Sequence, residues 1–275
     1  PDSKIEIDRR LDTIAGRGRD PVPQKVKFTT WTLRYNEMLW VTIDGMGRHW
    51  ERARVDAEIT GEGVVKVETK NVTALTLKMP AGHCPLDVTI KPLVVLDGRK
   101  LEAPPVQTDR SWTAHFRKKG RSWSVVDSPV EPGLHKRHGL QGPIDDAFMD
   151  SFIIVKPTGA ALNGRTGAWF DQEMKHAVEQ WRKTFRGEAR VTTDDKLTDA
   201  EIAGNNIVLW GDFNNNKVLA RIADKLPVKW NERGIAVGEK KFALDNHVLL
   251  MIFPNPLNPE RYVVLNSGVT FREFH

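Results

Sequence analysis

The sequence has almost no cysteine and no long hydrophobic run. Cys84 is the only cysteine among 275 residues, so neither an internal disulfide nor a cysteine-based metal site can form. No segment approaches the roughly 18 consecutive apolar residues that a membrane span requires. With 40% hydrophobic and 28% charged residues, the composition indicates a folded, soluble protein of about two domains.

Charge of one sign is also scarce. The 41 lysines and arginines exceed the 36 acidic residues by five, but the two kinds are interleaved in nearly every segment. The densest basic cluster, within residues 117–121, is typical of a solvated hairpin tip. We therefore expect neither a nucleic acid nor a membrane as a partner.

Common catalytic signatures are missing as well. The sequence lacks the G-x-S-x-G elbow that exposes a nucleophilic serine in hydrolases, and neither Ser151 nor Ser267 has such paired glycines. It also lacks H-E-x-x-H and any helical histidine pair that would hold a metal. We predict no catalytic residue, no cofactor and no metal for this chain.

Residues 1–20 are predicted to form a helix and a linker. Ile5, Leu11, Ile14 and Ala15 are spaced to share one face of a helix over residues 3–15, with Ser3 as its cap. The glycines and prolines of GRGRDPVP end this helix. The start without Met and the stop straight after a strand-like run indicate a piece of a longer protein.

Residues 21–127 show the period-two alternation of β-strands. Turn-forming pairs such as Asp44-Gly45 and Asp97-Gly98 separate the alternating stretches, which predicts an antiparallel, β-sandwich-like domain. The predicted strands are KVKFTTWTL, MLWVTI, ARVDAEI, VVKVETK, ALTLKM, LDVTIKPLVVL, WTAHF and SWSVV.

Tryptophan is abundant, with nine residues. Four of them lie in or beside the predicted strands, and a place in the sandwich core is the favoured interpretation, whereas exposed indoles could stack on sugar rings. These four are Trp31, Trp40, Trp112 and Trp123. His49 and Trp50 stand in a polar context after a turn, so they are candidates for a contact surface.

Residues 128–147 are rich in proline and glycine and are predicted to form an extended connector. His135 and His138, with Asp145 and Asp146 nearby, could form a zinc or proton-transfer site, although solvated or packed histidines are the favoured interpretation. The paired carboxylates could serve as acid and base. Capping the helix or turn that follows is their favoured use.

Residues 148–275 alternate strands with amphipathic helices. This predicts an α/β domain with a mostly parallel, doubly wound sheet of the flavodoxin or Rossmann type. We expect strands at 151–157, 206–211, 247–253 and 262–268, helices at 169–186 and 217–225, and a hairpin at 228–245 with its turn near Gly238.

One loop of this domain differs from a phosphate-binding P-loop by a single residue. Gly159 and Gly164 have the required spacing, but Arg165 stands where lysine is needed, and its guanidinium is not an equivalent point charge. Asp212 could hold magnesium, and Asn214 could join it at the same end of the sheet. A glycine-rich surface loop is the favoured interpretation.

Four segments resemble the C-terminal part of large bacterial serine hydrolases of the prolyl oligopeptidase (S9-like) and esterase type. In such proteins an α/β-hydrolase domain with the catalytic triad comes first, and its last helix resembles residues 3–15 of this chain. The segments, which span essentially the whole chain, are PDSKIEIDRRLD, KVKFTTWTLRYNEMLWVTIDGMGRHWERARVDAEI, HGLQGPIDDAFMDSFIIVKPTG and NPLNPERYVVLNSGVTFREF.

The resemblance implies that the catalytic residues lie upstream of Pro1 in an exported parent protein. The chain is then a non-catalytic accessory region that positions the α/β-hydrolase catalytic domain or shapes access of a peptide or carbohydrate-ester substrate. Two alternatives remain, a carbohydrate-binding module that uses the β-domain tryptophans and a nucleotide- or phosphate-binding α/β domain. The apolar strip of the helix should pack on the β-domain, on residues 139–149 or on a second copy.

Overall fold

The computed structural model describes residues 2–61, 63–130 and 132–269. The chain divides into two compact units, the first comprising residues 1–131 with 137–139 and the second residues 132–136 with 140–275. Both helices and several sheets are present, as expected for a chain that combines α/β with all-β structure. Glu62 of a predicted turn, Glu131 of the connector and the last six residues of the chain lie outside the described residues.

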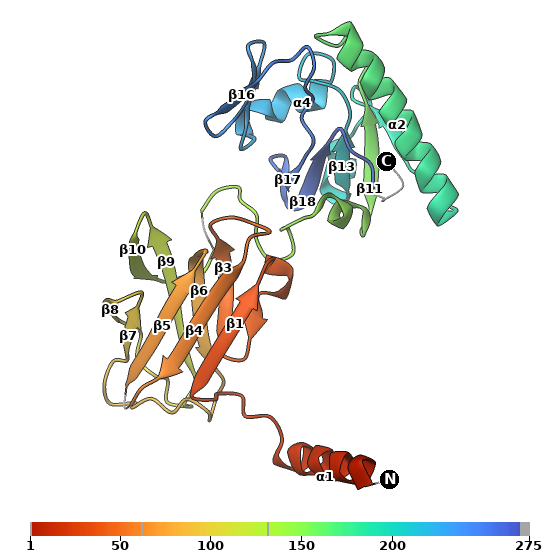
Figure 1. Ribbon diagram of the computed structural model, residues 1–275. Helices are drawn as coiled ribbons and strands as arrows, with labels where there is room; N and C mark the ends of the chain where they lie inside the picture. Colours follow the sequence, from red (N-terminus) through yellow and green to blue (C-terminus); the bar gives the residue numbers. More distant parts are fainter. Residues whose placement is uncertain (1, 62, 131, 270–275) are drawn as a thin grey trace. The chain divides into compact units, whose positions relative to one another are not determined.

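The first unit begins with helix α1 (Asp2–Arg17), which confirms the predicted helix and places Ser3 inside it rather than at its cap (Figure 1). At about 3.6 residues per turn, Ile7 rather than Ile5 shares a face with Leu11 and Ile14. These three side chains are 56%, 58% and 64% exposed, which contradicts the expected packing of the strip within the chain. A second copy as the partner is untested.

Two five-stranded sheets make up the rest of the first unit, with strand orders β1-β4-β5-β7-β8 and β10-β9-β6-β3-β2. Every predicted strand segment contains a strand, but β2 and β8 were not predicted, and β5 pairs with β7 in parallel. The strands are β1 (Lys25–Thr30), β2 (Glu37–Met38), β3 (Val41–Met46), β4 (Ala53–Ile59), β5 (Val64–Lys70), β6 (Val72–Met79), β7 (Leu93–Leu96), β8 (Arg99–Glu102), β9 (Trp112–Lys119) and β10 (Ser122–Val126).

Alternation along the strands builds one core shared by both sheets. Strand β4 buries every second residue, beginning with Ala53. Trp40, Trp112 and Trp123 are at most 1% exposed, which confirms the core interpretation for them. Their indole N–H groups donate to the Pro23 carbonyl, the Pro104 carbonyl and the Asp97 carboxylate, respectively, so each buried indole donor has a hydrogen-bond partner.

Asp97 anchors the turn between β7 and β8. Its carboxylate accepts hydrogen bonds from the Trp123 indole at 2.8 Å, from the Thr69 backbone N–H at 2.7 Å and from Lys118 Nζ at 3.2 Å. Burial alone would raise the pKa of Asp97, but these hydrogen bonds together hold the pKa below its ordinary value. One residue of the predicted basic hairpin tip, Lys118, is therefore paired with this carboxylate.

The second unit is built on a five-stranded sheet of order β12-β11-β13-β18-β17. The first four strands are parallel, as predicted, while β17 runs antiparallel to β18 and forms a hairpin with it. Strand β12 was not predicted. The strands are β11 (Phe152–Lys156), β12 (Val191–Thr193), β13 (Asn206–Leu209), β17 (Met251–Asn255) and β18 (Asn258–Leu265).

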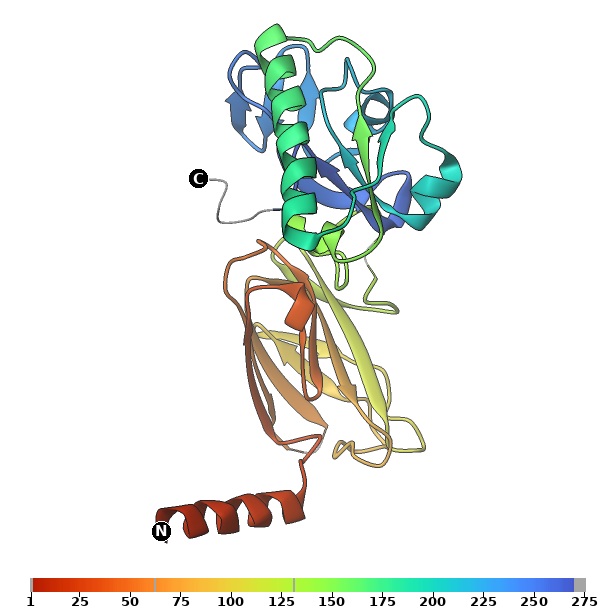
Figure 2. The same cartoon turned by 90° about the vertical axis from the view of Figure 1, so that its right-hand side faces the viewer.

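Helices cover both faces of this sheet (Figure 2). Helix α2 (Gly164–Phe185) packs Met174 and Ala177 on the face formed by β-strand residues such as Val208. Helix α4 (Lys217–Ile222) packs on the opposite face, with Ile207 among its neighbours. A third helix, α3 (Asp199–Gly204), was not predicted.

Helix α2 begins five residues before its predicted start at Trp169. The Asn163 side chain caps it by accepting a hydrogen bond of 2.8 Å from the Arg165 N–H. The predicted hairpin at 228–245 is a three-stranded sheet of β14 (Lys229–Asn231), β15 (Gly234–Val237) and β16 (Lys240–Phe242), and its second turn lies at Gly238 as expected.

Candidate functional site

Polar side chains gather where the parallel strands β11, β13 and β18 end, the edge at which open α/β sheets bind their ligands. The loop 157–163 follows β11, the loop 210–216 follows β13, and Asn266 follows β18. The structure brings Gly159, Asp212 and Asn214 together here, whereas Gly164 is the first residue of α2.

The carboxylate of Asp212 joins the two loops. Its Oδ1 accepts hydrogen bonds from the backbone N–H groups of Asn214 at 2.9 Å and Asn215 at 3.0 Å, and its Oδ2 accepts one from Leu162 at 2.9 Å. The Asn214 side chain donates to the Ala160 carbonyl at 2.9 Å. Asp212 is 3% exposed. Both carboxylate oxygens of Asp212 thus accept hydrogen bonds from backbone N–H groups. These bonds explain why a carboxylate is buried here, and no magnesium ion is needed for that explanation.

Gly159 allows the same two loops to approach closely. Its N–H, which would face a phosphate in a P-loop, donates instead to the Asn215 carbonyl at 2.9 Å. A Cβ at this position would lie 2.9 Å from the Asn215 Cα, so any larger residue would push the loops apart. The contact fits the glycine-rich surface loop that the sequence favoured.

Two buried asparagines of this edge were missed by the sequence analysis. Asn266, 1% exposed, accepts from the Gly211 N–H at 2.7 Å and donates to the Gly211 and Leu249 carbonyls. Asn216, fully buried, caps α4 by accepting from Val218 and donates to the Trp210 carbonyl. For Asn216, the run of three asparagines after a buried strand was the available signal.

A cavity of about 200 Å³ opens beside the start of α2 and is lined by Arg165, Trp169 and Asp245, among others. Ligand pockets usually measure about 300–1,000 Å³. A nucleotide would therefore need more room than this cavity gives, and the nucleotide alternative gains no support from it.

The connector residues singled out in the sequence do not form one cluster. Asp145 and Asp146 lie in the first turn of the 3₁₀ helix η2 (Ile144–Phe148), whose cap position is Pro143, so the expected capping role is wrong. Asp146 accepts instead from Gln141 Nε2 and from the Tyr262 hydroxyl.

The two connector histidines have separate surroundings. His135 Nδ1 lies 3.0 Å from the Gly133 carbonyl, and His138 Nδ1 lies 2.7 Å from the Leu33 carbonyl. They belong to different units. Among the residues that the structure describes, no group of three or more His, Cys, Asp or Glu side chains is arranged to hold a metal ion.

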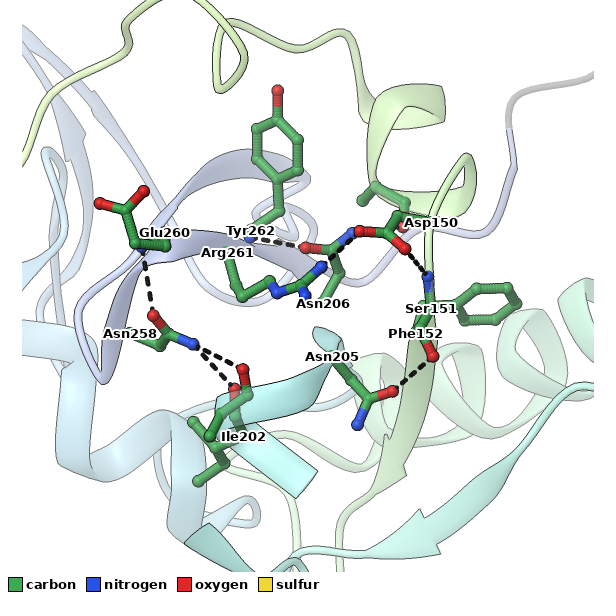
Figure 3. Close-up of polar contacts among 12 residues, drawn as sticks. Asp150, Ser151, Phe152, Ile202, Asn205, Asn206, Asn258, Glu260, Arg261 and Tyr262 are labelled. Carbon is green, nitrogen blue, oxygen red and sulfur yellow. Dashed lines mark hydrogen bonds and ion pairs between the residues drawn. The ribbon is translucent and has the colours of Figure 1, made fainter. Parts of the chain in front are cut away.

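The two serines considered as nucleophiles are engaged by groups other than a base. The Ser151 hydroxyl donates to Asn205 Oδ1 at 2.7 Å and accepts from Arg190 Nη2 at 2.6 Å. Figure 3 shows Ser151 just before β11, between Asp150 and Asn205. The Ser267 hydroxyl donates to the Gly268 carbonyl at 3.1 Å. Neither arrangement activates an oxygen for attack.

Comparison with protein-family models, curated proteins and solved structures finds no match to this chain. Function must therefore be inferred from the sites themselves. Within the described ranges, no helix combines the length and the apolarity needed to cross a lipid bilayer.

Three aromatic side chains of the first unit are exposed, and one of them is a predicted contact residue. Trp50 is 49% exposed, and its backbone N–H donates to the Trp31 backbone carbonyl at 3.0 Å. Trp31 is 52% exposed, so its predicted place in the core is wrong, because the alternation of β1 buries Val26, Phe28 and Thr30 and therefore turns the next position outward. Tyr35, in the 3₁₀ helix η1 (Leu33–Tyr35), is 71% exposed.

The loop that carries His49 and Trp50 is held by Asn71. Asn71 Oδ1 accepts from the Arg48 N–H at 2.7 Å, and Asn71 Nδ2 donates to the carbonyls of Arg48 at 2.8 Å and Glu51 at 3.2 Å. Both Asn71 and Trp50 have positive φ, 57° and 66°. Tryptophan rarely adopts this left-handed backbone conformation, so the surrounding hydrogen bonds must hold Trp50 in it.

A partly buried polar chain on β3, β6 and β9 was not predicted. Thr76 Oγ1 donates to Asp44 Oδ2 at 2.6 Å and lies 2.8 Å from His115 Nδ1. Burial raises the pKa of Asp44, although the Thr76 hydrogen bond opposes this, and burial lowers the pKa of His115. The fold therefore favours the uncharged form of each of these two residues.

We expect His115→Gln to flatten the pH dependence of stability in the first unit. A lowered histidine pKa contributes stability above about pH 6.5 that is lost as the pH falls through the folded-state value. Denaturant unfolding at pH 7.5, 6.5 and 5.5 should show a smaller loss in the variant than in the wild type. His83→Gln, at an exposed histidine, is the matched control. The same change in the free energy of unfolding with pH in all three proteins would contradict the prediction.

Proposed function

We propose that this chain is a non-catalytic accessory region of a serine hydrolase that acts on peptides or esters, and that α1 binds the hydrolase catalytic domain of the same protein. The observation that carries the proposal is the exposure of Ile7, Leu11 and Ile14 on one face of α1. Burying each such side chain is worth roughly 1.5–3 kcal/mol. A helix with an apolar face normally buries that face against another surface.

Isolated helices shorter than about 12–15 residues are marginal in water, and α1 is only slightly longer. Packing on another body would stabilise it. The resemblance of residues 3–15 to the last helix of an α/β-hydrolase domain supports that domain as the partner. The hydrogen bonds of Ser151 and Ser267 support an accessory rather than a catalytic role for this chain.

We also infer finer fold relationships for the two units. Two sheets with a common core support a β-sandwich-like domain in residues 21–127. Parallel strands with helices on both faces support a doubly wound, flavodoxin- or Rossmann-like domain in residues 148–275. Nucleotide binding by the second domain has less support, because Gly159, Asp212 and Asn214 bond to neighbouring protein groups.

The test compares two faces of α1 in the chain extended by its natural upstream sequence. Leu11→Asp, on the apolar face, should lower the melting temperature of the extended protein and its kcat/KM on ester or peptide substrates. Ile5→Asp, on the opposite face, is the matched control and should change neither. In the unextended chain both variants should melt like the wild type, because both side chains are already exposed.

Three results would contradict the proposal. One is turnover by the unextended chain that a serine-directed inhibitor abolishes. Another is an upstream sequence without an α/β-hydrolase domain. The third is a change in the oligomeric state of the unextended chain with Leu11→Asp, which would assign the strip to a second copy of the chain.

A further inference from the structure

We propose that Trp31, Tyr35 and Trp50 form a binding surface for a carbohydrate chain that carries carboxylate groups. The inference goes beyond the accessory role and does not involve α1. It rests on the exposure of these three rings, on the hydrogen bonds that hold their loops and on the charges beside them.

The three rings are exposed, whereas most large aromatic side chains of the described residues are buried or partly buried; Phe185 of the second unit is also exposed, at 50%. The three rings are 52%, 71% and 49% exposed, whereas Trp40, Trp112, Trp123 and Trp210 are at most 2% exposed. The hydrogen bond from Trp50 to Trp31 joins two loops that are separate in sequence. Tyr35 follows Trp31 within the same short loop. Trp31 and Tyr35 therefore follow the end of β1, and Trp50 lies in the loop between β3 and β4 that is bonded to Trp31.

The backbone beneath the rings is ordered before any ligand arrives. Asn71 clamps the loop of Trp50, as described above, and Thr32 caps η1 by accepting a hydrogen bond from the Arg34 N–H at 3.2 Å. A bulky residue held in the left-handed region costs stability, and such residues cluster at ligand-binding sites. Preorganised loops reduce the entropy lost on binding.

The chemistry of the surface favours a sugar polymer over a protein. Aromatic faces match the apolar faces of pyranose rings, and Tyr and Trp combine an apolar body with a polar group. Protein interfaces usually surround such aromatics with further apolar side chains, but the exposed Ile90 contacts the Gly63 turn, at the other end of β4 from Trp31. In sequence the rings are flanked mostly by polar residues, Thr32 and Arg34 in one loop and His49 and Glu51 in the other.

The flanking charges select the type of sugar. Segments 31–35 and 47–52 carry three exposed arginines, Arg34, Arg48 and Arg52, against one acidic residue, Glu51, which pairs with Arg48 at 3.1 Å, so two positive charges remain in excess. A guanidinium binds a carboxylate through paired hydrogen bonds. A uronate-bearing polysaccharide provides both rings for stacking and carboxylates for the arginines.

The experiment is titration calorimetry of the whole chain with polygalacturonate at 150 mM NaCl, with hydroxyethylcellulose as the uncharged polymer. We expect binding to polygalacturonate that weakens at least tenfold in Trp31→Ala and in Trp50→Ala. Ile90→Ala, an exposed apolar residue at the other end of the unit, should bind like the wild type. Hydroxyethylcellulose should bind more weakly than polygalacturonate.

Other outcomes would overturn the proposal. They are the absence of binding to polygalacturonate, equal affinity in the tryptophan variants, which would indicate diffuse attraction to a basic protein, and tighter binding of the uncharged polymer. Trp50→Gly separates binding from folding, because glycine adopts the positive φ without strain. It should lose affinity and melt at or above the wild-type temperature; a lowered melting temperature would assign Trp50 to an internal contact.

Discussion

Asp212→Ala is expected to destabilise the second unit by roughly 2–4 kcal/mol, because a buried donor left without a partner costs about 1–3 kcal/mol and the two part-buried donors add less. The substitution removes the acceptor of three backbone N–H groups, those of Leu162, Asn214 and Asn215. It also releases the loop after β11 from the loop after β13. The melting temperature of this unit should fall by roughly 10 °C.

Two variants make this result specific. Asp224→Ala removes an exposed carboxylate from the same unit and should leave its stability within about 0.5 kcal/mol of the wild type. Asp212→Asn keeps one acceptor oxygen but places an amide N–H₂ near one of the donors, so an intermediate loss is expected. If magnesium raised the melting temperature of the wild type but not of Asp212→Asn, the residue would be a metal ligand and the structural account would be wrong.

Trp112→Ala should destabilise the first unit by about 3–5 kcal/mol, the usual cost of removing a large aromatic side chain from a core. The residue is fully buried, and its indole N–H donates to the Pro104 carbonyl at 2.9 Å. The substitution therefore opens a cavity between the sheets and leaves that carbonyl without this donor. Calorimetry, with limited proteolysis to identify the unit that opens, measures the effect.

Trp31→Ala is the matched control, since it makes the same chemical change at a half-exposed position. It should cost much less than Trp112→Ala. Trp112→Phe keeps most of the ring but loses the hydrogen bond and should fall between the two. Because the two units have separate cores, Trp112→Ala should act on the first unit and Asp212→Ala on the second. Equal losses in Trp31→Ala and Trp112→Ala would contradict the assigned core.

Local patterns in the sequence predicted most of the strands and their buried faces. The alternation in ARVDAEI gives the buried positions of β4 directly, because side-chain direction in a strand has a period of two. The expectation for Trp31 failed because it followed residue type, whereas the same period of two places Trp31 on the exposed face with Lys25 and Lys27. Apolar spacing also missed the start of α2, where the capping side chain of Asn163 sets the boundary.

Features that depend on pairing between distant segments could not be predicted. The hairpin of β17 and β18 was interpreted as two strands of a parallel sheet, since both are apolar and only their register reveals the turn. The Asp44–Thr76–His115 chain exists because β3, β6 and β9 are adjacent, with Thr76 opposite His115. For Asp212, the sequence correctly predicted a position at the carboxyl ends of the parallel strands. It could not show which N–H groups donate to the carboxylate.

The positive φ of Trp50 has a consequence for how this chain would change under selection. A laboratory selection for heat resistance alone would tend to replace Trp50 with glycine or asparagine, residues that adopt the left-handed conformation at low cost. Only a requirement for the exposed ring itself would retain tryptophan there. At position 50, adaptation to high temperature would therefore favour glycine or asparagine, whereas retention of the aromatic surface would favour tryptophan.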